Sequence, residues 1–131
     1  MDPSSLLQAI KRLCSEHAAT WAVVLLGLDA LLTGVIIKKV PFTDIDWSTY
    51  LEQAEVFLGG ETDYSAIRGS TGPIAYPWAH VYVYSAFQWL QVSTLTAQVL
   101  FSLVYLATIA TVFRIYLAVG APGWLMALCV V

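Results

Sequence analysis

The chain has 131 residues, of which 59% are hydrophobic and 11% are charged. Soluble domains carry about 25% charged residues, so this composition excludes a soluble globule of this size and makes a lipid bilayer the expected solvent. The net charge of −3 argues against a nucleic-acid-binding protein, which needs a basic face.

Residues 1–17 form a polar lead in which apolar residues recur at helical spacing, with charged residues off that stripe. This pattern predicts a short interfacial helix. Two cysteines, Cys14 and Cys129, lie near the two chain ends without the spacing of metal ligands. We interpret them as unpaired small hydrophobic residues.

Residues 18–37 form an apolar run with one charge, which is long enough for a first transmembrane helix. Trp21 near one end and Lys38-Lys39 after the other are typical interface anchors. Asp29 is the exception inside this run, because an intramembrane carboxylate is costly and should face protein or water. It either bonds to a neighbouring helix or lies beside a polar site.

Residues 38–76 form the long polar loop of the chain. The part from Pro41 to Pro77 holds six of the nine carboxylates. Glycine and proline punctuate residues 62–76, so we expect an irregular loop there.

An amphipathic helix is predicted over residues 48–58 of this loop, lying along the membrane surface. Its apolar residues recur at helical spacing, and Gly59-Gly60 supplies a C-cap. Thr49 and Glu52 have the spacing of a capping box, in which each side chain bonds to a free backbone N–H.

Further apolar runs follow the polar loop. Residues 77–95 predict a second transmembrane helix, packed among others because it is mildly polar, and residues 99–119 predict a third. Residues 124–131 begin another apolar run and stop after eight residues, whereas a span needs about 20. The expectation is an all-α polytopic membrane protein, truncated after about three spans at the start of a fourth.

Asp44 and Asp46 are the first candidates for chemistry, because a carboxylate at a membrane–water boundary can accept a proton from an attacking hydroxyl. The same residues could bind a metal, cap the following helix or solvate a loop, and spacing alone leaves these alternatives open. The other four carboxylates of the loop are expected on a solvated surface. His80, in an aromatic segment, is more often a packing residue than a catalyst.

One combination of motifs is specific, namely Thr43-Asp44-Ile45-Asp46-Trp47 followed by Thr71-Gly72-Pro73 and Tyr76-Pro77. It resembles the dolichyl-phosphate-mannose-dependent α-1,3-mannosyltransferases of N-glycan precursor assembly, glycosyltransferase family 58. A glycosylphosphatidylinositol mannosyltransferase family carries a TDID-like string after its first span but lacks the TGP-x-x-YP continuation. It is the nearest competing family.

The resemblance implies a polytopic helical protein of the GT-C glycosyltransferase type in the endoplasmic reticulum membrane. Its N-terminus would be cytosolic and its loop over residues 38–76 luminal. It would transfer mannose from dolichyl-phosphate-mannose to lipid-linked Man5GlcNAc2 in α-1,3 linkage. Family members run several hundred residues, so we expect an N-terminal fragment that is inactive alone.

The resemblance also implies residue roles. A β-linked donor and an α-linked product mean inversion at the anomeric carbon, which needs one base. The family's motif favours Asp46 as that base and Asp44 as a supporting carboxylate. The candidate substrate-binding residues are Trp47, Tyr64, Arg68 and Tyr76. No metal or other cofactor is expected, because Arg, Lys or helix N-termini can meet one phosphate charge.

A function from another class stays open at this point. The chain could be a small, non-catalytic membrane subunit whose polar loop binds another protein. Composition alone does not exclude it.

Overall fold

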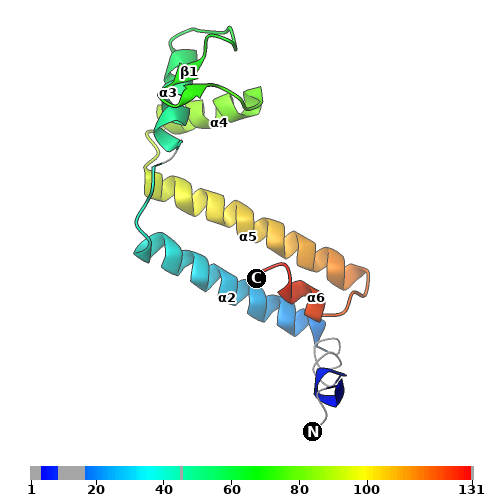
Figure 1. Ribbon diagram of the computed structural model, residues 1–131. Coiled ribbons are helices and arrows are strands. Elements are labelled where there is room, and N and C mark those ends of the chain that lie inside the picture. Colours follow the sequence, from blue (N-terminus) through cyan, green and yellow to red (C-terminus); the bar gives the residue numbers. More distant parts are fainter. Residues whose placement is uncertain (1–3, 9–16, 45, 131) are drawn as a thin grey trace. The chain divides into compact units, whose positions relative to one another are not determined.

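The computed structural model describes residues 4–8, 17–44 and 46–130. The chain divides into two compact units, one made of Met1–Val40 with Val99–Val131 and the other of Pro41–Gln98. Most of the described residues are helical, as Figure 1 shows. The helical class is therefore confirmed, and the two units are described in turn.

Helices α2 (Ala18–Lys39) and α5 (Thr94–Ala118) dominate the first unit. Among the described residues, they are the two helices that are long and apolar enough to cross a membrane. At 22 and 25 residues, they are about 33 Å and about 37 Å long, against a hydrocarbon core of about 30 Å. Both lie where the first and third spans were expected.

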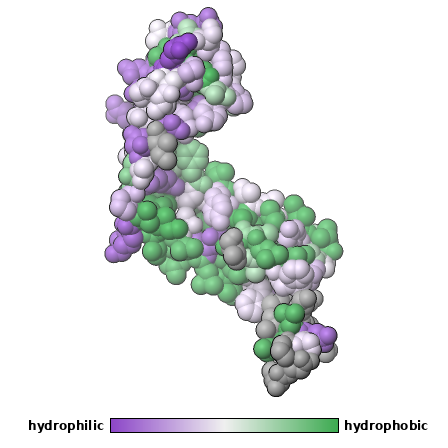
Figure 2. Space-filling view, viewed as in Figure 1, coloured by the Kyte–Doolittle hydropathy of each residue, from purple (hydrophilic) through white to green (hydrophobic). Residues whose placement is uncertain are grey.

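The two helices pack against each other in opposite directions. They lie side by side in Figure 1. Ala22 near the start of α2 shares a buried cluster with Ile109 and Phe113 of α5. Their outer faces expose large hydrophobic residues, which cover much of the visible surface of this unit (Figure 2). An exposed apolar surface of this kind suits lipid as its solvent.

Helix α6 (Trp124–Ala127) is a single turn within the first unit. Its Met126 is fully buried in the cluster formed with α2 and α5. Within the described residues, the segment where a fourth span was expected to begin forms this short helix, which packs on the helix pair. The interfacial helix predicted over 1–17 lies mostly outside the described residues. Within that range the structure describes residues 4–8, which are helical, and residue 17.

The second span predicted over 77–95 is not a span. Helix α4 (Trp78–Trp89) has 12 residues and is about 18 Å long, too short to cross the hydrocarbon core. It ends in a Schellman motif, with Gln91 at φ 51° and the Val92 N–H bonded to the Phe87 carbonyl at 2.9 Å.

A new helix begins directly after this stop. The Ser93 Oγ accepts the Thr96 N–H at 3.1 Å, which caps the N-terminus of α5. The expected run of 77–95 is therefore divided between α4 and the first turn of α5. As a result, α5 starts five residues earlier than the span predicted over 99–119.

The second unit is built on helix α3 (Trp47–Leu58), which agrees with the helix predicted over 48–58. It ends at Gly59, and Gly60 at φ 103° completes the predicted C-cap. Strands β1 (Arg68–Gly69) and β2 (Gly72–Pro73) form a small antiparallel hairpin where an irregular loop was expected.

The core of the second unit is small and aliphatic. Ile67, Ile74 and Val81 are buried together, from the two sides of the hairpin and from α4. Aromatic rings, including those of Phe57 and Trp78, pack around them. The hairpin therefore packs against both α3 and α4, which also contact each other directly.

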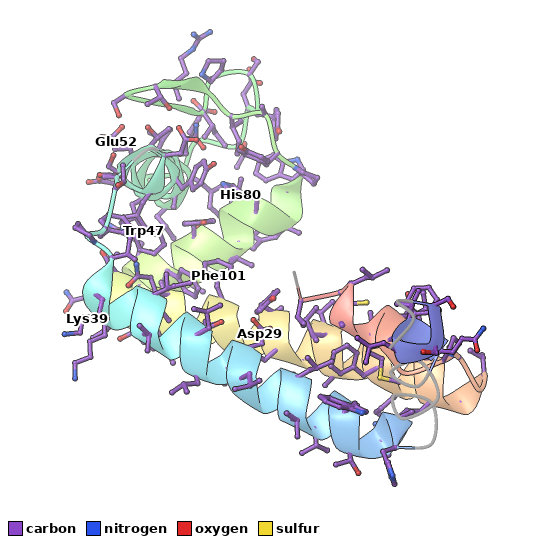
Figure 3. The ribbon with its side chains drawn as sticks, turned by 60° about the horizontal axis from the view of Figure 1, so that its bottom comes forward. Asp29, Lys39, Trp47, Glu52, His80 and Phe101 are labelled. Atoms are coloured by element: carbon purple, nitrogen blue, oxygen red, sulfur yellow. The ribbon has the colours of Figure 1, made fainter. Side chains whose placement is uncertain are left out.

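Asp29 lies in the middle of α2 and is 9% exposed (Figure 3). Tyr105 of α5 lies beside its carboxylate. Among the described residues, no group bonds to its Oδ2 atom. The carboxylate is therefore only partly compensated in an apolar setting.

We predict that Asp29→Leu improves the membrane insertion of α2 by about 3 kcal/mol, because an Asp at a helix centre opposes insertion and a Leu favours it. The measurement is the apparent free energy of insertion of residues 18–39 into microsomes, read from glycosylation sites on both flanks. Ala30→Leu at the neighbouring exposed position is the control, with an expected gain of about 0.5 kcal/mol. Equal gains at the two positions would contradict the prediction.

Candidate functional site

The site is centred on Asp46, the residue that precedes the first turn of α3. Its Oδ2 accepts a hydrogen bond from the Tyr50 hydroxyl at 3.3 Å, and its Oδ1 accepts one from the Thr71 hydroxyl at 3.3 Å. Tyr50 lies one helical turn further along α3, whereas Thr71 comes from the turn between the two strands. The carboxylate is therefore held by donors from two separate elements.

The helix cap is made by the other carboxylate. Asp46 stands at the N-cap position but forms no side-chain cap hydrogen bond. Instead, the Asp44 Oδ1 accepts the Ser48 N–H at 3.3 Å and satisfies one free donor of the first turn. The alternative in which Asp46 caps the helix is therefore wrong, and the capping role belongs to Asp44.

The capping box predicted from Thr49 and Glu52 is also wrong. Both residues lie inside α3, and their side chains bind the hairpin. The Thr49 Oγ1 accepts the Thr71 N–H at 3.2 Å, and the Glu52 carboxylate accepts the Ser70 N–H. Glu52 is thus a structural ligand of the hairpin, where a solvated carboxylate was expected.

Gly69 allows this close approach of the hairpin to α3. A Cβ atom at this position would lie 2.7 Å from the Thr49 carbonyl oxygen and 2.7 Å from its Cγ2 atom. Gln53 adds a third bond, since its Nε2 donates to the Gly72 carbonyl at 3.3 Å. These contacts fix the turn that carries Thr71.

Aromatic rings enclose the Tyr50 phenol. His80 of α4 meets the Tyr50 ring edge to face at 4.6 Å, and Tyr84 lies at 5.0 Å. Tyr76, from the segment before α4, stacks on His80 at 4.5 Å. The hydroxyl oxygens of Tyr76 and Tyr50 lie 3.0 Å apart. The Tyr50 side chain is thereby held between α3, α4 and the preceding loop.

The protonation states of this cluster follow from its surroundings. The hydrogen bond with Tyr76, then burial, then the negative charge of Asp46 raise the pKa of Tyr50 far above its usual range. Burial lowers the pKa of His80, so its imidazole is neutral at pH 7. Tyr50 therefore stays protonated and can donate to Asp46.

The predicted site residues are only partly brought together. Tyr76 joins Asp46 through Tyr50, whereas Asp44 points into the helix cap. Tyr64 donates from its hydroxyl to the Tyr76 carbonyl oxygen and so supports Tyr76 from behind.

Trp47 and Arg68 lie elsewhere in the same unit. Trp47 packs on Tyr84 and Phe87 with ring centroids 5.6 Å and 6.2 Å away, which is a packing role (Figure 3). Arg68 is exposed on β1, and none of the described contacts links it to Asp46.

Sequence analysis missed Tyr50 and Thr71 as partners of Asp46. The signal for Tyr50 was its position four residues after Asp46, which places the two side chains on one face of a helix. Thr71 could not be found in this way, because it lies 25 positions away. Within the described part of the chain, no three His, Cys, Asp or Glu residues gather closely enough to hold a metal ion.

Comparisons with known proteins connect this site to one family. The family model described as ALG3 protein matches residues 23–131. A Neurospora crassa protein named Dol-P-Man:Man(5)GlcNAc(2)-PP-Dol alpha-1,3-mannosyltransferase is 47% identical over 104 residues, covering 77% of this chain and 24% of that protein.

Relatives with the same name occur in a plant and in a second fungus. The Arabidopsis thaliana protein is 41% identical over 86% of this chain and 26% of its own length, and a Cryptococcus neoformans protein is 38% identical over 92% and 28%. The chain spans about a quarter of the length of these curated relatives. No solved structure matches it.

We predict that Gly69→Ala loosens the hairpin from α3, because the added methyl group overlaps the backbone of Thr49. Overpacking of this kind costs about 1–3 kcal/mol. Amide hydrogen exchange of Ser70 and Thr71 measures it, since their N–H groups are bonded to α3. Gly34→Ala, where no atom lies within 4 Å of the new methyl, is the control. Equal protection in the two variants would contradict the prediction.

Proposed function

The chain belongs to the ALG3 family, and on that premise we propose that the protein transfers mannose from dolichyl-phosphate-mannose to lipid-linked Man5GlcNAc2 in α-1,3 linkage. Donor and acceptor are those in the names of the relatives. The setting that fits them is the endoplasmic reticulum membrane, with a polytopic GT-C type of fold and a luminal loop over residues 38–76. The two apolar helices α2 and α5 support a membrane location.

The reaction needs a base on the acceptor side. The acceptor hydroxyl oxygen attacks the anomeric carbon of mannose while the bond from that carbon to the phosphate oxygen breaks. The hydroxyl proton must leave in the same event, and a carboxylate within hydrogen-bonding reach can take it. Dolichyl phosphate departs as a weak base, so a general acid is not obligatory.

Asp46 is the base in this proposal. The observation that carries this assignment is that its carboxylate is oriented by two hydroxyl donors and is free of the helix cap. Asp44, with its Oδ1 on the Ser48 N–H, acts as the supporting carboxylate by fixing the start of α3. The two acidic residues of the motif thereby receive different tasks.

The remaining site residues contact substrates in this proposal. Tyr76 is 42% exposed beside the Asp46 cluster, and its ring can stack on a sugar. Trp47 and Tyr64 hold the aromatic surroundings and can meet sugar or lipid at their edges. Arg68, exposed on the hairpin, is the partner for the donor's phosphate.

We predict that Asp46→Asn lowers kcat/KM for mannose transfer by about 10²–10⁴-fold, the range typical of a general base. Asp44→Asn should cost less, because its amide oxygen can still accept the Ser48 N–H. The assay uses this chain and a chimera in which it replaces the matching segment of the Neurospora crassa relative. Labelled dolichyl-phosphate-mannose is offered with Man5GlcNAc2-lipid.

A glycosylphosphatidylinositol precursor is the control acceptor in the same assay. Transfer to that precursor in preference to Man5GlcNAc2-lipid would favour the competing family. Near-normal turnover of the Asp46→Asn chimera would remove Asp46 from the role of base.

We also predict that transfer does not depend on a metal ion, because the single phosphate charge of the donor can be met by Arg68 and backbone N–H groups. Activity of the chimera should remain within about twofold after treatment with EDTA, a difference of less than about 0.5 kcal/mol in the barrier. Loss of activity with EDTA that Mn²⁺ or Mg²⁺ restores would show that the prediction is wrong.

A further inference from the structure

The hydroxyl groups around Asp46 can be arranged as one chain of hydrogen-bond donors. The Tyr50 hydroxyl carries one proton, which it donates to the Asp46 Oδ2. In that arrangement Tyr76 donates across its 3.0 Å contact with Tyr50, for which either hydroxyl can be the donor. The resulting chain runs from Tyr76 through Tyr50 to Asp46, with both O–H dipoles pointing toward the carboxylate.

The first member of this chain is held in place on both sides. The Tyr76 backbone carbonyl accepts a hydrogen bond from the Tyr64 hydroxyl, and the Tyr76 ring stacks on His80 at 4.5 Å. The Tyr50 ring lies edge to face against Tyr76 at 5.5 Å and against His80 at 4.6 Å. These ring contacts and the bond from Tyr64 favour the observed positions of both phenols, which preorganises the chain.

The titratable groups around Asp46 come from each element packed against it. Tyr50 comes from α3, Tyr76 from the loop before α4, and His80 and Tyr84 from α4; Asp44 is the second carboxylate on the approach to α3. Burial lowers the pKa of His80 and raises that of Tyr84, so both are neutral at pH 7. Among the described residues, no Lys or Arg forms an ion pair with Asp46.

When water leaves the Asp46 carboxylate, other hydrogen-bond donors must take its place. When lipid and sugar substrates occupy the site, they displace solvent from around Asp46, and desolvation favours its protonated form. Hydroxyl donors favour the ionised form, and donors that are themselves hydrogen-bonded are polarised and bond more strongly. The Thr71 hydroxyl, whose one proton faces both the Asp46 Oδ1 at 3.3 Å and the Thr49 Oγ1 at 3.0 Å, acts in the same sense when it donates to Asp46.

We propose that Tyr76 and Tyr50 form a directional hydrogen-bond chain that keeps the Asp46 carboxylate ionised and oriented while substrates are bound. Both tyrosines are positioning residues, because they act on the acceptor's proton only through Asp46. This role deepens the proposed function and rests on Asp46 being the base.

The test is the dependence of kcat/KM on pH in the chimera that carries this chain. Tyr50→Phe keeps the ring and removes the hydroxyl that donates to the Asp46 Oδ2. The acid limb of the profile should move upward by about one pH unit, the value of one hydrogen bond to a charged group. Tyr76→Phe should move it in the same direction by less, since Tyr50 then remains but is less polarised.

Two sets of controls accompany these variants. Thr71→Val should move the acid limb upward and Thr71→Ser should restore it, because serine keeps the hydroxyl. Tyr82→Phe alters a tyrosine of the other aromatic cluster, which packs on Phe57 and Trp78, and should leave the profile unchanged. The position of the limb does not depend on the amount of folded enzyme, so a partial loss of folding does not imitate the effect.

The outcomes distinguish a failure of the proposed hydrogen-bond chain from a failure of the proposed function. An acid limb that stays in place in both tyrosine variants, while Asp46→Asn is inactive, would overturn the hydrogen-bond chain and leave Asp46 as base. Turnover that survives Asp46→Asn would overturn both. An upward shift in Tyr50→Phe with a smaller one in Tyr76→Phe supports the chain, and equal shifts in Tyr82→Phe would overturn it.

Discussion

The second unit depends on the hydrogen bonds between α3 and the hairpin turn, which together we call the clamp. Thr49, Glu52 and Gln53 bind backbone groups of the hairpin turn from one side of the helix. Strands of two residues cannot hold themselves together in water, so the hairpin owes its position to these bonds and to the missing side chain of Gly69. Since Thr71 sits on that turn, the orientation of Asp46 depends on the same clamp.

Local patterns predicted some elements well and others poorly. Helix α3 was predicted to within one residue, because its apolar residues repeat with the helical period and Gly59-Gly60 marks its end. The hairpin was missed because its partners are side chains 18 to 22 positions earlier. The stop after Trp89 was missed because Gln91, unlike glycine, gives no sign of a positive φ.

The two carboxylates of the TDIDW motif show where sequence reasoning reaches its limit for the site. Either residue could cap α3 or serve as a base, since both lie within reach of the first turn. The choice depends on tertiary contacts: a hydroxyl from the hairpin and a phenol from α3 draw the Asp46 side chain away from the helix end. The family's motif favoured Asp46 as the base, and the hydrogen bonds explain in physical terms why it is available.

The kind of group that holds Asp46 matters for its chemistry. An arginine beside a carboxylate lowers its pKa by about 1–3 units, which makes it a weaker proton acceptor. Neutral hydroxyls from Tyr50 and Thr71 orient the carboxylate without placing a positive charge beside it. They also leave cationic residues of the loop available for the donor's phosphate. In the proposed reaction the site accepts a proton from a sugar beside an anionic lipid, and hydroxyl donors serve that task better than an ion pair.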